Sequence, residues 1–501
     1  MKFVKIILIL IVFCITSELN AAFYVSPDGD DNNPGTFELP FKTITKAHSV
    51  VASGDTIYIR GGVHQYSLTI TISKIGTSDK KYYMLAYPGE RPIIDFSLTA
   101  LGTRGISLSG RYWYIYGLDI KGAGDNGMHI RGSYNVVENC AFYENKDTGL
   151  QLGNGAAYNQ IINCDSYHNI DPGEGNADGF APKLDVGTGN YFYGCRAWQN
   201  SDDGYDGYLR GANNITTTYE NCWAFKNGYR ANGTPSVGNG NGFKMGGSDD
   251  KTLMHNVNMK NCLAFDNRVK GFDQNNNKGS MILYNCTAYR NGTNYGMSSA
   301  IYTDSGKVME LINCAVLGSI GSIWSGSIQK TNSWMPQFSV TAADFVSIDT
   351  TGVRGPRNPD GSLPELPFMR LAYGSQLIDA GTDVGLPYYG NAPDIGAYES
   401  NYTNSAGNEI NKPLTFKLYQ NYPNPFNPST NIKFVVDRNE FTILEIYNTL
   451  GQKIVTLFAD YVMSGKVYEL TFSSEKLSAG TYFYKLQSGN KIEIKKMLII
   501  K

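Results

Sequence analysis

The stretches NCAFYEN (Asn139–Asn145) and NCDSYHN (Asn163–Asn169) place Asn, Cys, an aromatic residue and a second Asn at the same offsets. The pattern continues along the chain at intervals of 24 to 40 residues, measured from one cysteine to the next. The cysteines of the series are Cys140, Cys164, Cys195, Cys222, Cys262, Cys286 and Cys314, and the last has lost the aromatic residue and the second Asn. A motif that recurs at such a period predicts a solenoid, in which each repeat packs on the next.

Each repeat is expected to consist of strands. The residues around the motifs are rich in β-branched and aromatic side chains, Gly and Asn, and they lack the 3.6-residue apolar period of a helix. A repeat of about 24 residues accommodates three short strands and three turns. We therefore predict an all-β fold, a right-handed parallel β-helix of about ten coils. Because its coils stack ~4.8 Å apart, equivalent residues form ladders along the axis.

The motif predicts three such ladders. The second Asn of each motif is expected at a bend, in the left-handed conformation that Asn tolerates. The cysteines are expected to be buried free thiols, because stacked Cβ atoms point the same way and do not face one another. The aromatic ladder is expected to contribute packing rather than sugar binding. The ladder asparagines are Asn145, Asn169, Asn200, Asn227, Asn267 and Asn291, and the aromatic residues include Tyr143, Tyr167, Trp198 and Phe225.

Composition and the N-terminal residues limit the possible partners and location. With 43 basic and 45 acidic residues among 501, the net charge is -2, which argues against nucleic acid or an anionic membrane as the main partner. We expect a monomer. Lys2 and Lys5 precede an apolar run and two alanines, Ala21 and Ala22, which predicts a secretory signal peptide over residues 1–21. The alternative is a buried first strand.

The rest of the chain is predicted to contain two domains. Residues 22–400 are assigned to the β-helix, with a short helix near Ile44–Val51 covering its open end. Residues 401–415 are a polar linker, and residues 416–501 alternate strand-like segments with tight turns, which predicts a small β-sandwich.

The C-terminal segment contains NYPNPFNPST (Asn421–Thr430), IYNTLGQKI (Ile446–Ile454) and a basic, apolar tail. These motifs resemble the C-terminal sorting domain of the type IX secretion system. The resemblance implies contact with the outer-membrane secretion machinery and a secreted or cell-surface protein. The alternative is a carbohydrate-binding module.

The stretch NSDDGYDGY (Asn200–Tyr208) crowds three aspartates into five residues without any Lys or Arg. The strands that follow the Asn bend align as TGLQ, DGFA, DGYD, NGFK and KGFD, beginning at residues 148, 178, 203, 241 and 270. In this alignment Asp178 and Asp203 occupy one position of adjacent coils, with Asp202 and Asp206 close by. Carboxylates so close repel one another, and a Ca²⁺ ion, which takes several carboxylate oxygens, relieves the repulsion. The alternative is a solvated turn, since Asp-Gly pairs are common in turns.

The same alignment places Lys244 in the register of Asp206, one coil further on. A neighbouring cation lowers the pKa of a lysine, and a neutral amine is a competent general base. This combination suits β-elimination on a uronic acid polymer, with Lys244 taking the C5 proton. Insertions before Asp178 and before Lys244 are expected to flank a cleft. Lys183, Arg196 and Arg210 are candidates for binding substrate carboxylates, and the five histidines are assigned no role.

Three stretches include these residues: NADGFAPKL (Asn176–Leu184), GNYFYGCRAWQNSDDGYDGY (Gly189–Tyr208) and NGFKMGG (Asn241–Gly247). They resemble the motifs of polysaccharide lyase family nine, the pectate lyases with ten-coil β-helices. The resemblance implies a Ca²⁺-dependent pectate lyase that cleaves polygalacturonate in pectin. It also implies Lys244 as the base, with the metal held by Asp178, Asp202, Asp203 and Asp206.

Three other hypotheses remain. A β-helical glycoside hydrolase of the polygalacturonase type would use paired carboxylates as acid and base. A lyase or epimerase for another uronan, such as alginate, would share the chemistry but not the substrate. A non-catalytic surface carbohydrate binder would use the same solenoid, with Ca²⁺ in a structural role only.

Overall fold

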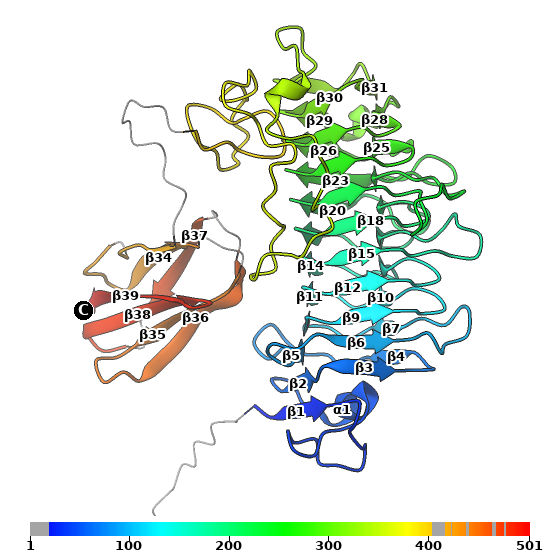
Figure 1. Cartoon of the computed structure of the whole chain (residues 1–501). Helices are drawn as coiled ribbons and strands as arrows, with labels where there is room; N and C mark the ends of the chain where they lie inside the picture. The colour runs from blue at the N-terminus through cyan, green and yellow to red at the C-terminus, as the bar shows by residue number, and fades with distance from the viewer. Residues whose placement is uncertain are drawn as a thin grey trace, which may run out of the picture.

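Three parallel sheets run the length of a right-handed β-helix in the computed structural model (Figure 1). The structure describes residues 20–402, 416–421, 423–436, 440–462, 467–474 and 477–500. The predicted signal peptide therefore lies almost entirely outside the described residues, as does most of the predicted linker. The all-β prediction and the parallel β-helix are confirmed.

Each complete coil contributes one strand to each sheet, in the order sheet A, sheet B, sheet C, and sheet A has one further strand at either end, β1 and β32. Sheet A contains β1 (Ala22–Val25), β2 (Thr56–Ile59), β5 (Tyr82–Ala86), β8 (Trp113–Tyr116), β11 (Val136–Glu138), β14 (Gln160–Ile162), β17 (Asn190–Tyr193), β20 (Ile215–Glu220), β23 (His255–Lys260), β26 (Met281–Tyr284), β29 (Met309–Ile312) and β32 (Ile328–Lys330). Sheet B contains β3 (Gly62–Gln65), β6 (Pro92–Asp95), β9 (Asp119–Lys121), β12 (Ala141–Tyr143), β15 (Asp165–Tyr167), β18 (Arg196–Trp198), β21 (Trp223–Phe225), β24 (Leu263–Phe265), β27 (Thr287–Tyr289) and β30 (Ala315–Leu317). Sheet C contains β4 (Ile70–Ile72), β7 (Ile106–Leu108), β10 (Met128–Ile130), β13 (Leu150–Leu152), β16 (Phe180–Pro182), β19 (Tyr205–Asp206), β22 (Phe243–Lys244), β25 (Lys270–Asp273), β28 (Thr293–Met297) and β31 (Gly321–Ile323).

Helix α1 (Ile44–Val50) lies at the N-terminal end of the β-helix, as the sequence predicts (Figure 1). Thr43 caps it by accepting a hydrogen bond from the Lys46 N–H, which satisfies one of the free N–H groups of the first turn. Ile44 and Ala47 are buried in the main core, so the helix covers the first coils. Two short 3-10 helices follow much later, η1 (Thr303–Ser305) and η2 (Ala342–Asp344).

The asparagine ladder forms, but its backbone differs from the prediction. The Nδ2 of each ladder Asn donates to the Oδ1 of the next, at 2.9 to 3.0 Å from Asn145 to Asn291. The prediction that these asparagines are left-handed is wrong, because the residue before each one has the positive φ. Those residues are Glu144, His168, Gln199, Lys226, Asp266 and Arg290. The chain thus turns one residue early, and the Asn side chains lie along the corner, buried from Asn145 to Asn267.

The other two ladders agree with their predictions. All seven cysteines of the series are free and buried. The aromatic rings stack from Tyr143 through Tyr167 and Trp198 to Phe225, with centroids 4.4 to 5.5 Å apart. Trp198 and Phe225 form a second core with residues of the segment 345–395, so this stack contributes to packing.

The C-terminal strands are antiparallel and form two small sheets with their own core. One sheet contains β33 (Lys417–Leu418), β34 (Ser429–Val435) and β37 (Val467–Ser473). The other contains β36 (Lys453–Val462), β35 (Glu440–Tyr447), β38 (Gly480–Ser488) and β39 (Lys491–Ile499). Within the described ranges, no helix is long and apolar enough to cross a membrane.

The asparagine ladder provides a test of the fold. Asn267 is buried, accepts from Asn227 Nδ2 and donates to Asn291 Oδ1 and the Ala224 carbonyl. We expect Asn267→Ala to lower the free energy of unfolding by about 1–3 kcal/mol for each buried group left unpaired. Urea unfolding measures this loss, with the exposed Asn232→Ala as the control. Equal midpoints for the two variants would contradict a stabilising ladder.

Candidate active site

The outer row of sheet C contains the residues at the fourth position of the five aligned strands. We use this name for Gln151, Ala181, Asp206, Lys244 and Asp273, which follow one another across β13, β16, β19, β22 and β25. Their inward neighbours form a core stack that runs through Phe180, Tyr205, Phe243 and Phe272, with centroids 4.5 to 5.3 Å apart. Because side chains alternate along a strand, the outer row faces away from this core.

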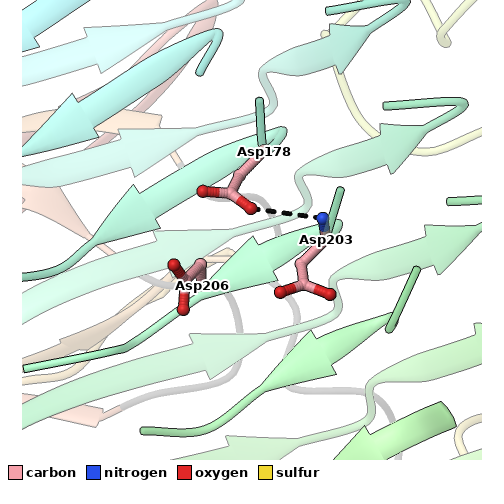
Figure 2. A group of neighbouring side chains, drawn as sticks. All are labelled: Asp178, Asp203 and Asp206. Atoms are coloured by element: carbon pink, nitrogen blue, oxygen red, sulfur yellow. Dashed lines mark hydrogen bonds between the residues drawn. The ribbon is translucent and has the colours of Figure 1, made fainter. Parts of the chain in front are cut away.

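Three aspartates converge at this row, as Figure 2 shows. Asp178, Asp203 and Asp206 each offer a carboxylate oxygen within 4.8 Å of the others, and all three are buried. The Asp203 N–H donates to Asp178 Oδ1 at 3.2 Å, which ties the two coils together. Asp202 lies outside this group of three, and its Oδ1 accepts from the Asn239 N–H.

Two ammonium groups alternate with the carboxylates. Lys183 Nζ lies 2.6 Å from Asp178 Oδ2 and 3.5 Å from Asp206 Oδ2. Lys244 Nζ lies 3.1 Å from Asp203 Oδ2 and 3.3 Å from Asp206 Oδ1. Asp206 therefore contacts both lysines, and the site is an ionic network of buried groups.

Burial and mutual repulsion change the acidity of these carboxyl groups. Burial raises the pKa of Asp178 to about 7, although the Lys183 ammonium opposes this shift. Burial, with repulsion from Asp203 and Asp178, raises the pKa of Asp202 to about 9. Burial also acts to raise the pKa of Asp206, but its two lysine neighbours outweigh this effect and leave the pKa below its ordinary value.

The base candidate is protonated in this arrangement. Burial alone would lower the pKa of Lys244, but the surrounding carboxylates, Asp206 first among them, raise it well above its ordinary value. A neutral amine therefore requires that another positive charge neutralise these carboxylates.

The residues present fit a hard divalent cation. The converging ligand atoms are all carboxylate oxygens, the type that Ca²⁺ prefers. Asp203 Oδ2 is buried without a hydrogen bond, although it lies 3.1 Å from Lys244 Nζ as an ion pair. Since buried polar atoms usually have a hydrogen-bond partner, this oxygen is suited to an additional ligand.

Neighbouring coils supply supporting contacts that the sequence analysis missed. Asn241 donates to Asp203 Oδ1 from both its backbone N–H and its Nδ2, at 2.8 and 2.9 Å. Thr148 Oγ1 donates to Asp178 Oδ2 at 3.2 Å. Both residues stand first in the aligned strands TGLQ and NGFK, so the alignment contained the signal.

The two insertions meet beside the acidic group. Glu174, in the insertion before Asp178, accepts two hydrogen bonds from Arg230, in the insertion before Lys244, at 2.8 and 2.7 Å. Ser236 Oγ also donates to the carbonyl of Ser201, next to Asp202. The loops are thus joined at one corner of the β-helix, where they support Asp202 through Asn239.

The three candidates for substrate binding have different environments. Lys183 is buried against Asp178, so its charge is already used within the network. Arg196 is 2% exposed on sheet B, where it forms a bidentate pair with Asp165 at 2.8 and 2.7 Å, so the structure does not bring it to the acidic group. Arg210 pairs with Asp249 on the surface, with 62% of its side chain exposed, and remains available to an anionic ligand.

A family model described as the Pel9A-like, right-handed β-helix region matches residues 23–312 of this chain. The chain belongs to this family. It is a polysaccharide lyase. Residues 420–501 match a second model, the secretion system C-terminal sorting domain.

Relatives and solved structures agree with this assignment. Pectate lyase L of Dickeya dadantii is 39% identical over 394 residues, which cover 76% of this chain and 90% of the relative. Pectate lyase L of Paenibacillus polymyxa is 40% identical, over 72% of this chain and 84% of the relative. The crystal structure of pectate lyase Pel9A has a TM-score of 0.71 and 39% identity, and covers 76% of this chain and 97% of that one.

The pKa of Asp202 predicts how stability depends on pH when a chelator is present. Its pKa rises from 3.8 in the unfolded chain to about 9 in the folded one. The folded state therefore binds the proton more tightly, so this contribution to stability is fully present below pH 3.8 and is lost as the pH rises toward about 9.

We expect the free energy of unfolding to fall less with rising pH in Asp202→Asn, because the amide stays neutral and still accepts from the Asn239 N–H. Between about pH 5 and about pH 9, the wild-type free energy of unfolding should fall by at least about 1 kcal/mol more than that of the variant. Denaturant unfolding at the two pH values measures this difference, with Asp304→Asn as an exposed control. Parallel pH profiles for wild type and Asp202→Asn would refute the raised pKa.

Proposed function

We propose that this chain is an exported, calcium-dependent pectate lyase that cleaves α-1,4-galacturonan by β-elimination. The observation that supports this most strongly is the position of Lys244 on the outer row, where its Nζ lies 3.1 Å from Asp203 and 3.3 Å from Asp206. The 39% identity with pectate lyase L, over 90% of that relative, supports the substrate.

Asp178, Asp203 and Asp206 would hold the cation, with Asp202 beside them. When bound, Ca²⁺ would supply positive charge next to the sugar carboxylate, which makes the C5 proton more acidic. The same carboxylates position Lys244, because two of them contact its Nζ from the preceding coil.

Lys244 would act as the base in its neutral form. Its Nζ accepts the proton from C5, and the electrons of the C5–H bond form a double bond between C4 and C5. The bond from C4 to the glycosidic O4 breaks, and the departing oxygen takes a proton. The products are a shorter chain and an oligosaccharide with an unsaturated uronate at its new end.

Residues close to Lys244 would orient the polymer. The Tyr208 ring lies 5.5 Å from Lys244 Nζ and 5.9 Å from the Arg210 guanidinium. Tyr208 also donates to Asp249, the partner of Arg210, at 2.7 Å. We propose that Arg210 pairs with a substrate carboxylate next to the cleaved unit.

Export rests on the ends of the chain. The predicted signal peptide over residues 1–21 would direct the protein across the inner membrane. The C-terminal region, which matches the sorting-domain model over residues 420–501, would engage the type IX machinery at the outer membrane. The enzyme would then act outside the cell or on its surface.

A second substrate class has an observation in its favour. A structure described as rhamnogalacturonan lyase has a TM-score of 0.63 and 28% identity, and covers 72% of this chain and 98% of that one. A panel with polygalacturonate and rhamnogalacturonan distinguishes the two, and we expect the faster reaction on polygalacturonate.

Lys244→Arg tests the base. Arginine keeps a positive charge against Asp203 and Asp206, but its guanidinium does not lose a proton in proteins. We expect normal folding and loss of activity, by at least about a hundredfold, as measured by the ultraviolet absorbance of the unsaturated product. Lys244→Ala should be equally inert, and the exposed Lys251→Ala should keep full activity. Substantial turnover by Lys244→Arg would rule out the proposed mechanism.

Asp203→Asn tests the cation site. The amide can still accept from Asn241, but it removes a charged oxygen from the group of three. Calorimetric titration with Ca²⁺ should show binding to the wild-type protein and a loss of at least about tenfold in affinity in the variant. A chelator should abolish product formation by the wild type, and added Ca²⁺ should restore it. Unchanged Ca²⁺ affinity in Asp203→Asn would exclude this residue as a ligand.

A further inference from the structure

The outer row of sheet C continues beyond Gln151 toward the N-terminus. His129 on β10 pairs with Gln151 on β13, in the register that leads through Ala181 and Asp206 to Lys244. His129 is therefore four coils from Lys244, or roughly 19 Å at the usual spacing between strands. A ligand that lies along the row and reaches both residues must be a chain of several sugar units.

His129 is buried without a hydrogen-bond partner. Its neighbours on β10, Met128 and Ile130, point into the main core, so the imidazole lies on the opposite face of the strand. The residue is 2% exposed, and both ring nitrogens lack a partner among the described residues. Since buried polar groups are nearly always hydrogen-bonded, this histidine is suited to binding a polar ligand.

Other polar atoms converge on the same point. A side-chain carbon built on Gly153 would lie 3.3 Å from His129 Nε2, 3.7 Å from Gln151 Nε2 and 3.1 Å from Asp185 Oδ1. A side-chain carbon would be crowded at 3.1 and 3.3 Å, so the glycine is what allows these three groups to lie so close together. Asp185 Oδ1 already accepts from the Asn154 N–H at 2.6 Å, and Gln151 Oε1 accepts from Asn126 Nδ2 at 3.3 Å, so the imidazole and Gln151 Nε2 are the groups still available.

Two arginines give this region positive charge. Burial, together with Arg104 and Arg131, lowers the pKa of His129 to about 4, although Asp185 opposes the shift. The imidazole is then neutral at ordinary pH, with one nitrogen as donor and the other as acceptor. Arg104 Nε is buried without a hydrogen bond and lies 3.6 Å from Asp125 Oδ2, and Arg131 is exposed.

We propose that His129, Gln151 and Arg131 form a distal subsite for a uronate unit of the same polysaccharide chain whose cleavage is assigned to Lys244. His129 and Gln151 bind sugar hydroxyl groups, and Arg131, assisted by Arg104, pairs with the carboxylate. The subsite rests on the proposed function, because its ligand is the galacturonan that extends from the cleaved bond. It makes the enzyme prefer long substrates.

The test compares trigalacturonate, which is too short to reach His129 from Lys244, with octagalacturonate. Steady-state rates are measured for wild type, His129→Leu, His129→Gln and Gly153→Ala, after thermal unfolding has verified that each variant folds. His64→Leu is the matched control, since His64 is also a buried histidine but lies on β3 of sheet B.

We expect His129→Leu to raise KM for octagalacturonate about tenfold, as for the loss of one or two hydrogen bonds, with kcat/KM for trigalacturonate unchanged. Gly153→Ala should act in the same way, because its methyl group would crowd and displace the imidazole and the Gln151 amide, and His129→Gln should recover part of the affinity. His64→Leu should leave the ratio between the two substrates unchanged.

Two outcomes would overturn the proposal in different ways. If the wild type cleaves both substrates but the ratio is the same in His129→Leu and Gly153→Ala, the distal subsite does not exist, and the proposed function stands. If the wild type cleaves neither, the proposed function fails and the subsite fails with it.

Discussion

The in-register stacking of coils is the constraint on which the structure depends. Parallel strands of successive coils pair residue by residue, so a side chain at one position lies next to its counterpart 18 to 40 residues away. The asparagine ladder maintains this register at one corner through an unbroken series of side-chain hydrogen bonds from Asn145 to Asn291. A one-residue slip would exchange the inward and outward faces of a strand and disperse the site.

This stacking has an electrostatic consequence. It brings three carboxylates and two ammonium groups into a buried region, where removing charges from water is costly unless each one is paired. In this network the lysines neutralise the carboxylates, and the carboxylates keep Lys244 protonated. With a divalent cation among them, the carboxylates would no longer hold Lys244 in its protonated form. The cation would neutralise the negative charge that the Lys244 ammonium now balances.

Much of this arrangement could be predicted from local patterns in the sequence. The repeated Asn and Cys predicted the solenoid, and the alignment of DGFA, DGYD and NGFK predicted which residues of sheet C lie side by side. Contacts with distant segments could not be predicted. Arg196 has Asp165 and the carbonyl of Val353 as partners, and the latter lies 157 residues away in a segment without a repeat. The left-handed conformation was predicted for each ladder Asn but belongs to the residue before it, because the pattern locates a bend but not the backbone angles within it.

The most direct measurement is the pKa of Lys244 itself, with and without Ca²⁺. Competitive acetylation of the folded protein at a series of pH values, followed by mass spectrometry, gives the protonation of this one amine. With a chelator present, its pKa should lie well above that of an ordinary lysine, because the carboxylates are unneutralised. Saturating Ca²⁺ should lower it substantially. An equal pKa under the two conditions would contradict the central claim that these aspartates hold a cation that converts Lys244 into a base.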